Sequence, residues 1–437
     1  MSRKYHVITF GCQKNEYDSQ LISALLASMG YERTEDPGEC DVLVLNTCTI
    51  RNKADVKVYG RLGQYRDLKR ANPDLITVVA GCLAEKDGKR LLSRFSNVSI
   101  VVGPRNIGKL PELIRYVART GKRRTATGLG SMDFEVLPVL RDRSYAAWIP
   151  VTEGCDCRCT YCIVPYVRGP MTSRPMEHIM AEAREFAAGG GVEVTLLGQN
   201  VNAYGTDNPS FGDFGAVLRG VDSIDGIRRI RFMSPHPRGF SDELIETMAS
   251  LGKVCRHVHL PLQSGDDVIL RRMNRRYTTA DYAKIVEKLR REIEGIAITT
   301  DIIAGFPGET EEQFGRTLDF VREIGFDGAF MFAYSEREGT PAVRITPAVP
   351  PEERLDRLNR LIALQNGITL ERHKRAEGTW AEVLVETVSK KDGAFLTGKT
   401  ERKSVVNLTG SPDLIGKIVR VKLTKAYTWG FMGEMEK

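Results

Sequence analysis

The stretch that decides the fold covers residues 149–169 and reads IPVTEGCDCRCTYCIVPYVRG. It contains Cys155, Cys159 and Cys162 in a CxxxCxxC run that directly follows an apolar, strand-like segment. A short loop of this kind can wrap one face of a [4Fe–4S] cluster with three thiolates, leaving one iron without a protein ligand. A structural zinc site usually has four ligands in two separated pairs. The spacing therefore favours an iron–sulfur cluster, with zinc as the second interpretation.

Two other residues of this loop need an assignment. Cys157 lies inside the run, and Tyr161 directly precedes its last cysteine. The aromatic residue fits a CxxxCx-aromatic-C form, in which Cys155, Cys159 and Cys162 are the ligands. We therefore interpret Cys157 as a thiol near the cluster that does not bind iron. Tyr161 is a candidate contact for the cofactor that binds the open iron.

The loop belongs to a series of alternating strand and helix patterns. Helix-like segments such as Met176–Ala188 and Thr279–Glu292 separate six apolar runs that predict strands: Ala147–Val151, Val192–Leu197, Arg229–Met233, His257–Leu262, Ile296–Ile303 and Ala329–Ala333. Such alternation is typical of βαβ units on a parallel sheet. Six repeats predict an open, partial (β/α)6 barrel with its chemistry at the C-terminal ends of the strands.

An N-terminal parallel α/β domain is predicted from the same alternation ahead of this series. Cys12, Cys48 and Cys82 each follow the end of a predicted strand, in the strings ITFGC, LVLNTC and VVAGC. Parallel strands end at the same edge of their sheet, where ligands of open α/β folds collect. We therefore expect these three thiols to meet. Cys40 and Cys255 precede their strands and are predicted to be packing residues.

The C-terminal segment has a different character. An amphipathic helix is predicted to run from Pro351 to about Lys374 and to pack between domains. Short alternating strands over residues 375–437 predict a small all-β barrel. This segment carries eleven Lys and Arg against eight Asp and Glu, a net charge of +3 that suits contact with phosphate. Its aromatic residues can stack on bases or fill the core: Tyr427, Trp429 and Phe431.

Composition sets the broad class. Of 437 residues, 42% are hydrophobic and 27% charged, which predicts a soluble globular protein. We expect domains at residues 1–125, 145–374 and 375–437, with a linker over 126–144. No export signal or apolar run long enough for a membrane span is visible, which predicts a cytoplasmic protein without a membrane partner. In that reducing compartment the nine cysteines are expected to bind metal more often than to form disulfides.

Two cysteine triads followed by a small β domain resemble the radical-SAM methylthiotransferases along essentially the whole chain. The similarity is carried by GCQKNEYDS, NTCTIRNKADVKVYGRLG, GCLAEKDG, TEGCDCRCTYCIVPYVRGP, HLPLQSGDDVILRRMNRRYT, TDIIAGFPGETEEQF and YSEREGTPA. Within that family the chain is most similar to the MiaB branch, the tRNA-2-methylthio-isopentenyladenosine synthases. Cys157 and Lys14 depart from the residues common in that branch, which are Asn and Met or Leu. The C-terminal segment resembles a TRAM module, an RNA-binding barrel.

The resemblance implies a transferase with two [4Fe–4S] clusters and S-adenosylmethionine as cofactors. The cluster of the CxxxCxxC run binds and reductively cleaves S-adenosylmethionine, and the 5′-deoxyadenosyl radical removes hydrogen from C2 of an adenine. The auxiliary cluster at Cys12, Cys48 and Cys82 carries sulfur, which a second S-adenosylmethionine methylates before its transfer. The expected partners are a tRNA with isopentenyladenosine next to its anticodon and a flavodoxin-like or other reductant. The chain is expected to act as a monomer.

Polar residues at the strand ends of the partial barrel are candidates to hold S-adenosylmethionine or substrate. Gln199 follows the second strand, where radical-SAM enzymes often have a Gly-Gly-Glu-like loop for the methionine amino group. Arg174 is the candidate for the methionine carboxylate. The others lie at later strand ends: Ser234, Gln263, Asp301 and Tyr334.

Three alternatives stay open. The substrate can be an aspartate of a ribosomal protein, as in the RimO branch, although Gln13-Lys14-Asn15 and Gln263-Ser264 differ from the strings typical of that branch. It can also be threonylcarbamoyladenosine in tRNA. An alternative of another class is a non-catalytic RNA-binding protein with structural zinc. The sulfur donor and the role of Cys157 are not fixed by the sequence.

Overall fold

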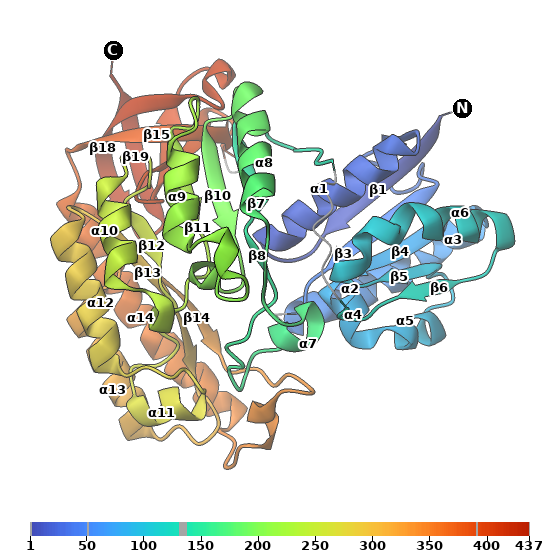
Figure 1. The fold of residues 1–437 in the computed structure, drawn as a ribbon. Helices are drawn as coiled ribbons and strands as arrows, with labels where there is room; N and C mark the ends of the chain where they lie inside the picture. Colours follow the sequence, from blue (N-terminus) through green and yellow to red (C-terminus); the bar gives the residue numbers. More distant parts are fainter. Residues whose placement is uncertain (1, 50–51, 131–137, 390–391, 437) are drawn as a thin grey trace.

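A computed structural model describes residues 2–49, 52–130, 138–389 and 392–436. Figure 1 shows the N-terminal α/β domain in blue on one side, the central partial barrel in green to yellow, and a small β barrel in red against that barrel. In the described part of the chain, no helix has the length and apolar character needed to cross a membrane.

The N-terminal domain is built on a six-stranded parallel sheet in the order β2-β1-β3-β4-β5-β6. Its strands are β1 (Arg3–Thr9), β2 (Tyr31–Arg33), β3 (Val42–Thr47), β4 (Ile76–Gly81), β5 (Ile100–Val102) and β6 (Arg124–Ala126). Its helices are α1 (Gln13–Ser28), α2 (Asn52–Gln64), α3 (Arg66–Ala71), α4 (Cys82–Asp87), α5 (Lys89–Arg94), the 3-10 turn η1 (Pro104–Lys109) and α6 (Leu110–Thr120). Every residue of the central strands β3 and β4 is buried, as expected for a parallel sheet covered on both faces.

The partial barrel consists of two parallel three-stranded sheets, β7-β10-β11 and β12-β13-β14. A parallel bridge pairs Ile230 of β11 with Val254, three residues before β12. The strands are β7 (Ala146–Pro150), β10 (Glu193–Leu197), β11 (Arg229–Phe232), β12 (His257–His259), β13 (Ala297–Ala304) and β14 (Gly328–Ala333). The outer helices are α8 (Met176–Ala188), α9 (Phe214–Asp222), α10 (Asp242–Ser250), α11 (Asp267–Arg272), α12 (Thr279–Glu292) and α13 (Glu311–Ile324). The predicted six-repeat series is confirmed.

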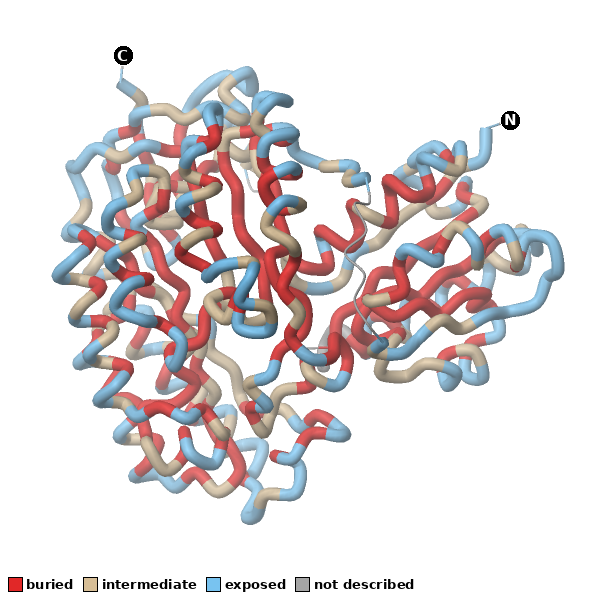
Figure 2. Tube along the Cα trace, viewed as in Figure 1, coloured by how far each residue is buried: buried red, intermediate tan, exposed pale blue. Residues whose placement is uncertain are grey.

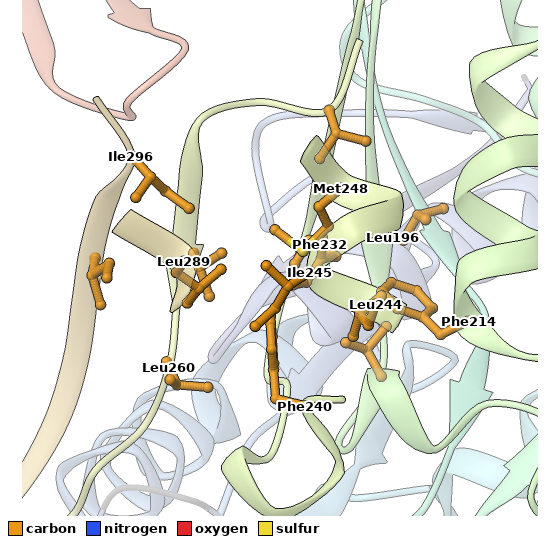
Figure 3. Packing of buried hydrophobic residues seen from close by; sticks show 14 of the residues in the cluster. Leu196, Phe214, Phe232, Phe240, Leu244, Ile245, Met248, Leu260, Leu289 and Ile296 are labelled. Atoms are coloured by element: carbon orange, nitrogen blue, oxygen red, sulfur yellow. The ribbon is translucent and has the colours of Figure 1, made fainter. Parts of the chain in front are cut away.

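The largest hydrophobic core lies between the barrel strands and the outer helices. Figure 3 shows Leu196 and Phe232 of the strands facing Phe214 of α9 and the side chains of α10. The rings of Phe214 and Phe232 meet edge to face, with centroids 5.3 Å apart. In Figure 2 the barrel strands β10, β11 and β12 are buried along their length, whereas the outer helices alternate between buried and exposed residues. This alternation explains why the helical periodicity could be read from the sequence.

One predicted strand is shorter than expected. The apolar run His257–Leu262 predicts six residues, but β12 ends at His259. Pro261 has no N–H group to donate to a neighbouring strand. The N–H of Leu262 donates instead to Thr300 Oγ1 at 2.9 Å, and Gln263 pairs again through a bridge with Ile302. The proline therefore interrupts the strand just before a predicted site residue.

The C-terminal helix and barrel follow the prediction closely. Helix α14 (Pro351–Arg375) packs between the partial barrel, at β13 and β14, and strand β18 of the C-terminal barrel. The latter closes in the order β15-β16-β17-β19-β18, with β15 (Trp380–Val388), β16 (Phe395–Thr400), β17 (Val405–Thr409), β18 (Ile418–Tyr427) and β19 (Gly430–Met435). The predicted small all-β barrel is therefore confirmed.

Two arginines fix the C-terminal barrel to the central one. Arg229 donates to the carbonyl oxygens of Lys399 and Glu382, both at 2.9 Å. Arg231 donates to those of Glu401 and Thr400, both at 2.8 Å. Because Arg229 begins β11, the C-terminal barrel lies at the N-terminal ends of the central strands, opposite the cysteine loop.

Candidate active site

The structure brings the three N-terminal cysteines to one edge of the sheet. Cys12 caps the N-terminus of α1 after β1, Cys48 directly follows β3, and Cys82 begins α4 directly after β4. These three strands are neighbours, with Thr9 paired with Asn46 and Thr47 paired with Gly81. The expected meeting of three strand ends is therefore observed.

Glycines before two of these cysteines allow the close approach of neighbouring chain segments. Gly11 has φ +144°, and a Cβ added there would lie 2.6 Å from Cys48 Cβ. Gly81 has φ +89°, and its added Cβ would lie 2.4 Å from the Thr47 carbonyl oxygen. Glycine is needed at both positions because any side chain would push the strand ends apart.

Polar contacts hold the thiols at this edge. The Cys12 thiol donates to Asn15 Oδ1 at 3.4 Å, and the Asn15 amide donates to the Thr47 carbonyl at 3.1 Å. A hydrogen bond with Cys48 lowers the pKa of Cys12 to about 6. The thiolate is the form that binds metal, so the chemistry of this edge fits an iron–sulfur ligand set. Sequence reasoning missed Asn15, although the motif GCQKN places it on the first turn of the helix.

The second triad lies in the loop between the short strand β8 (Thr152–Glu153) and helix α7 (Val164–Arg168). Strand β8 pairs with β9 (Thr172–Ser173), which closes the loop at its base. The Cys155 N–H donates to the Gly169 carbonyl at 3.1 Å, and Cys162 N–H donates to the Cys159 carbonyl at 3.0 Å. Gly154 has φ +79°, and a Cβ there would lie 2.1 Å from the Pro170 carbonyl oxygen. The loop is thus fixed by its own backbone.

Cys157 points to a different set of partners. The Asn200 amide donates to Cys157 Sγ at 3.3 Å. A hydrogen bond with Cys155 and burial together raise the pKa of Cys157 to about 12. Cys157 therefore lies beside the loop triad, and its interpretation as a thiol that does not bind iron stays a prediction.

A buried charged group lies where the two triads meet; we call Lys14, Asp18, Glu153 and Arg168 the junction group. Lys14 Nζ lies 2.7 Å from Asp18 and 3.0 Å from Glu153. Arg168 reaches the same carboxylates at 2.8 Å and 2.7 Å. The side chains of Cys82, Ile163 and Val167 pack together beside it. Helix α7 therefore connects the cysteine loop to the auxiliary triad.

The junction group was missed from the sequence, yet two signals pointed to it. Lys14 and Asp18 are four residues apart on a helix, and Glu153 and Arg168 flank the CxxxCxxC run. A second arginine, Arg105 of η1, donates to the carbonyl oxygens of Arg168 at 2.8 Å and Pro170 at 2.6 Å. Single-residue reasoning could not pair these groups across domains.

Two of the predicted cofactor residues are neighbours, and a third holds the cysteine loop. Gln263 N–H donates to the Asp301 carbonyl at 2.8 Å. His259 Nε2 lies 3.3 Å from Asp301 Oδ2. Gln199 Oε1 accepts the N–H of Gly154 at 2.5 Å, next to the first ligand candidate of the run.

Backbone strain marks two of the predicted strand-end residues. Ser234 has φ +59° and Gln263 has φ +77°. A left-handed conformation at a non-glycine residue costs about 1–3 kcal/mol and concentrates at functional sites. Arg158, inside the cysteine loop, shares this conformation with φ +47°. The strain therefore supports these strand ends as the functional end of the barrel.

The two predicted tyrosines pack on the same ring. Tyr161 lies 6.5 Å from Phe306 between centroids, and Tyr334 lies 5.5 Å from it. Within the described residues, the buried Tyr334 hydroxyl has no hydrogen-bond partner. It is thus a polar atom available to a ligand at the strand ends.

Arg174 has a different environment. Its guanidinium pairs with Glu182 of α8 and is buried. Arg141 donates to the other oxygen of Glu182 at 2.8 Å. Arg174 was predicted to bind the methionine carboxylate. In the structure it is already paired with a carboxylate of the protein.

A polar cavity of about 420 Å³ lies between helix α1 and the partial barrel. Helix α1 contributes Gln13, Glu16 and Gln20 to its wall. The barrel interior and the C-terminal barrel supply most of the rest, including Trp148, Glu193, Thr195, Arg231, His257, Glu386, Lys399 and Lys403. Burial lowers the pKa of Lys403 to about 8. All three domains therefore meet at one cavity.

In the described ranges, no group of three or more His, Cys, Asp or Glu side chains is arranged to hold a metal ion. The ligands of a cubane bind different irons. The assignment of the six cysteines as cluster ligands stays a prediction.

Three family patterns match the chain in succession. The Uncharacterized protein family UPF0004 matches residues 4–103, the Radical SAM superfamily matches 149–321, and the TRAM domain matches 374–434. Together with the partial barrel and its cysteine loop, the central match defines the class as a radical-SAM protein.

Full-length relatives specify the family. The chain is 44% identical over 426 residues to the tRNA-2-methylthio-N(6)-dimethylallyladenosine synthase of Carboxydothermus hydrogenoformans, covering 97% of each chain. It is 42% identical to the synthase of the same name from Natranaerobius thermophilus, covering 99% of this chain and 97% of the relative. The chain belongs to the tRNA-2-methylthio-N(6)-dimethylallyladenosine synthase family. The resemblance read from the sequence is confirmed.

A solved structure supports the fold. The radical S-adenosylmethionine methyltransferase TsrM from Kitasatospora setae matches with a TM-score of 0.59 and 16% identity. The match covers 87% of this chain and 81% of that one. At this identity the likeness concerns the arrangement of elements alone.

Proposed function

We propose that this chain is a radical-SAM methylthiotransferase that adds a methylthio group to C2 of isopentenyladenosine next to the anticodon of tRNA. The observation that carries the proposal is the pair of cysteine triads, one at an edge of the N-terminal sheet and one in the barrel loop, connected through helix α7. One cluster would serve radical formation alone. A second triad beside it provides a place for the sulfur.

The chain would hold two [4Fe–4S] clusters, one on Cys155, Cys159 and Cys162 and the auxiliary one on the three thiols at the sheet edge. When bound, the clusters and S-adenosylmethionine supply the radical that removes hydrogen from C2 and the sulfur that replaces it. The low pKa of Cys12 and the convergence of three strand ends support the auxiliary ligand set.

Residues at the strand ends would bind and orient S-adenosylmethionine. Gln199 already fixes the loop through Gly154, and the Tyr334 hydroxyl is available to a polar ligand. Ser234, Gln263, Asp301 and Tyr161 complete this set. Arg174 would need to leave Glu182 to bind a carboxylate, so it acts by supporting the wall of the site.

The C-terminal barrel would bind the tRNA. Tyr427 and Trp429 are stacked with centroids 5.0 Å apart, and Trp429 is 45% exposed. Lys425 Nζ lies 5.4 Å from the centroid of the Tyr427 ring. An exposed aromatic pair beside a cation suits stacking of bases and contact with phosphate. Phe431 is buried and belongs to the core.

The remaining partners follow from the chemistry. A flavodoxin-like or similar reductant would deliver the electron, and the chain would act as a cytoplasmic monomer. The domain division at residues 1–125, 145–374 and 375–437 would separate sulfur delivery, radical formation and RNA binding.

Mass spectrometry of tRNA nucleosides after anaerobic turnover tests the proposal. The reconstituted protein should bind about eight irons if each triad carries a four-iron cubane. Isopentenylated tRNA should gain the mass of a methylthio group, and tRNA without the isopentenyl group should not. An unchanged tRNA together with modification of a ribosomal protein would overturn the tRNA assignment. A colourless, zinc-loaded protein would overturn the enzyme assignment as well.

A further inference from the structure

In each cysteine triad, one thiol accepts a hydrogen bond from the guanidinium of a buried arginine. Arg168 Nε lies 3.3 Å from Cys82 Sγ, and Arg275 Nη1 lies 3.4 Å from Cys159 Sγ. The exposed fractions of the two arginines are 3% and 5%. Neither was expected from the sequence, and neither is explained by packing alone, since a buried charge is costly unless it is paired.

The two arginines differ in what balances their charge. The other two donors of Arg168 go to Glu153 at 2.7 Å and Asp18 at 2.8 Å. With Lys14, which shares both carboxylates, the junction group has two positive and two negative side chains. Its formal charge is therefore balanced before any thiolate is counted.

Arg275 has neutral partners instead. Its Nη2 donates to the Pro261 carbonyl at 2.8 Å, and its Nε donates to the Tyr277 hydroxyl at 3.0 Å. Its hydrogen-bond partners thus include no carboxylate. Arg275 donates to the thiol of Cys159, and no carboxylate among its hydrogen-bond partners balances its positive charge. Arg168, in contrast, has two carboxylate partners.

Hydrogen bonds to sulfur and local charge set the reduction potential of an iron–sulfur cluster. Reduction adds one negative charge, which a nearby cation stabilises. We propose that Arg168 and Arg275 are positioning residues that each raise the reduction potential of one cluster, the auxiliary and the S-adenosylmethionine-binding cluster respectively, with the larger effect from Arg275. This inference rests on the proposed function, because it needs the two ligand triads.

Anaerobic redox titration of the full-length holoenzyme, followed by electron paramagnetic resonance, tests the inference. Cys82→Ala and Cys159→Ala first assign the signals, since each retains one cluster. Arg275→Gln should lower the ratio of reduced to oxidised S-adenosylmethionine-binding cluster at a fixed potential about tenfold, a shift of about 59 mV for one electron. Arg168→Gln should lower the ratio for the auxiliary cluster by less. Each variant should leave the reduction potential of the other cluster unchanged.

Three further variants separate a change of potential from misfolding. Arg123→Gln is the control, because Arg123 donates to the carbonyl oxygens of Leu92 and Phe95 ahead of β6, at the sheet edge opposite the auxiliary triad, and its loss should leave both potentials unchanged. Arg168→Lys and Arg275→Lys keep the charge and should recover part of each shift.

The outcomes are distinct from those of the proposed function. A protein with about four irons would overturn the two-cluster proposal itself. Two loaded clusters with unchanged potentials in the Gln variants would overturn the inference alone. Equal shifts of both signals in one variant would overturn the assignment of one arginine to one cluster. Loss of the paired cluster in both the Gln and Lys variants would show a role in assembly and also overturn the claim about potential.

Discussion

The two cysteine triads are built in opposite ways. Cys12, Cys48 and Cys82 come from three strand ends spread over 71 positions of the chain, and meet only because β1, β3 and β4 are neighbours. Cys155, Cys159 and Cys162 share a single loop of eight residues. The auxiliary site therefore depends on long-range strand pairing, whereas the other depends on the closure of one loop by β8 and β9.

The two sites therefore depend on different contacts to form. A non-local site needs the sheet to form before any ligand can act, because loop closure costs conformational entropy until distant contacts offset it. A local loop keeps its spacing even when distant contacts weaken. The junction group ties both sites together, so it is the place where a single change should affect both.

Removing one ligand from each triad should produce the largest effects and separate the two sites. Cys12→Ala and Cys159→Ala should each lower bound iron from about eight to about four per chain. Both should abolish formation of methylthiolated tRNA. Only Cys12→Ala should still release 5′-deoxyadenosine from S-adenosylmethionine, because it retains the loop triad. Iron analysis and chromatography of the products check this.

Cys157→Ala is the matched control for these variants. Its thiol accepts a hydrogen bond from Asn200 and is not one of the three ligands assigned to the run, so iron content should stay at about eight. A loss of about four irons in this variant would show that Cys157 is a ligand and would require a new assignment of the run.

The next largest effect should come from the junction group. Glu153→Gln leaves Lys14 and Arg168 with one carboxylate, Asp18, in a buried site. Breaking a buried ion pair by removing one partner costs about 3 kcal/mol. We expect a lower urea midpoint of the holoenzyme and reduced occupancy of both clusters. Circular dichroism in anaerobic urea titrations, with iron analysis, measures both.

Two variants sharpen this result. Glu153→Gln combined with Lys14→Met removes a cation along with the carboxylate and should recover part of the midpoint. Glu39→Gln breaks the exposed pair with Lys4 and should leave the midpoint unchanged, since exposed ion pairs contribute little. Equal midpoints for all three variants would contradict a stabilising role of the junction group.

The same contrast shows what the sequence could predict. Strand ends and loop spacing were readable because each depends on local pattern, and both triads were found where the strands predict them. The pairing of Arg168 with Asp18, 150 positions away, was not readable, because charge pairs across domains leave no periodic signal. Arg174 was predicted to bind the carboxylate of S-adenosylmethionine. Its partner in the structure is the carboxylate of Glu182 on the following helix.

Two glycines allow a more selective test of the two sites. Gly81→Ala and Gly154→Ala each place a Cβ within 2.4 Å of a carbonyl oxygen at positive φ. In each variant, strain of about 1–3 kcal/mol should destabilise one triad and leave the other unaffected. Gly81→Ala should lower auxiliary occupancy, and Gly154→Ala should lower occupancy of the loop triad. Gly60→Ala, where an added Cβ meets nothing within 4 Å, is the control. Parallel loss of both clusters in either variant would contradict the separation of the sites.

The smallest effect should arise outside both triads, in the C-terminal barrel. Trp429→Ala removes one exposed ring from the stacked pair with Tyr427 and should weaken tRNA binding by about 1 kcal/mol, roughly fivefold. Iron content should not change, because Trp429 is exposed and lies in the C-terminal barrel, whereas both ligand triads lie in other domains. Leu355→Ala removes an even more exposed apolar side chain from α14 and should leave the affinity unchanged. Filter binding at fixed salt measures both.

Equal affinities for Trp429→Ala and the unaltered protein would show that tRNA contacts another face. The basic wall of the cavity at Lys399 and Lys403 would then be the next surface to test.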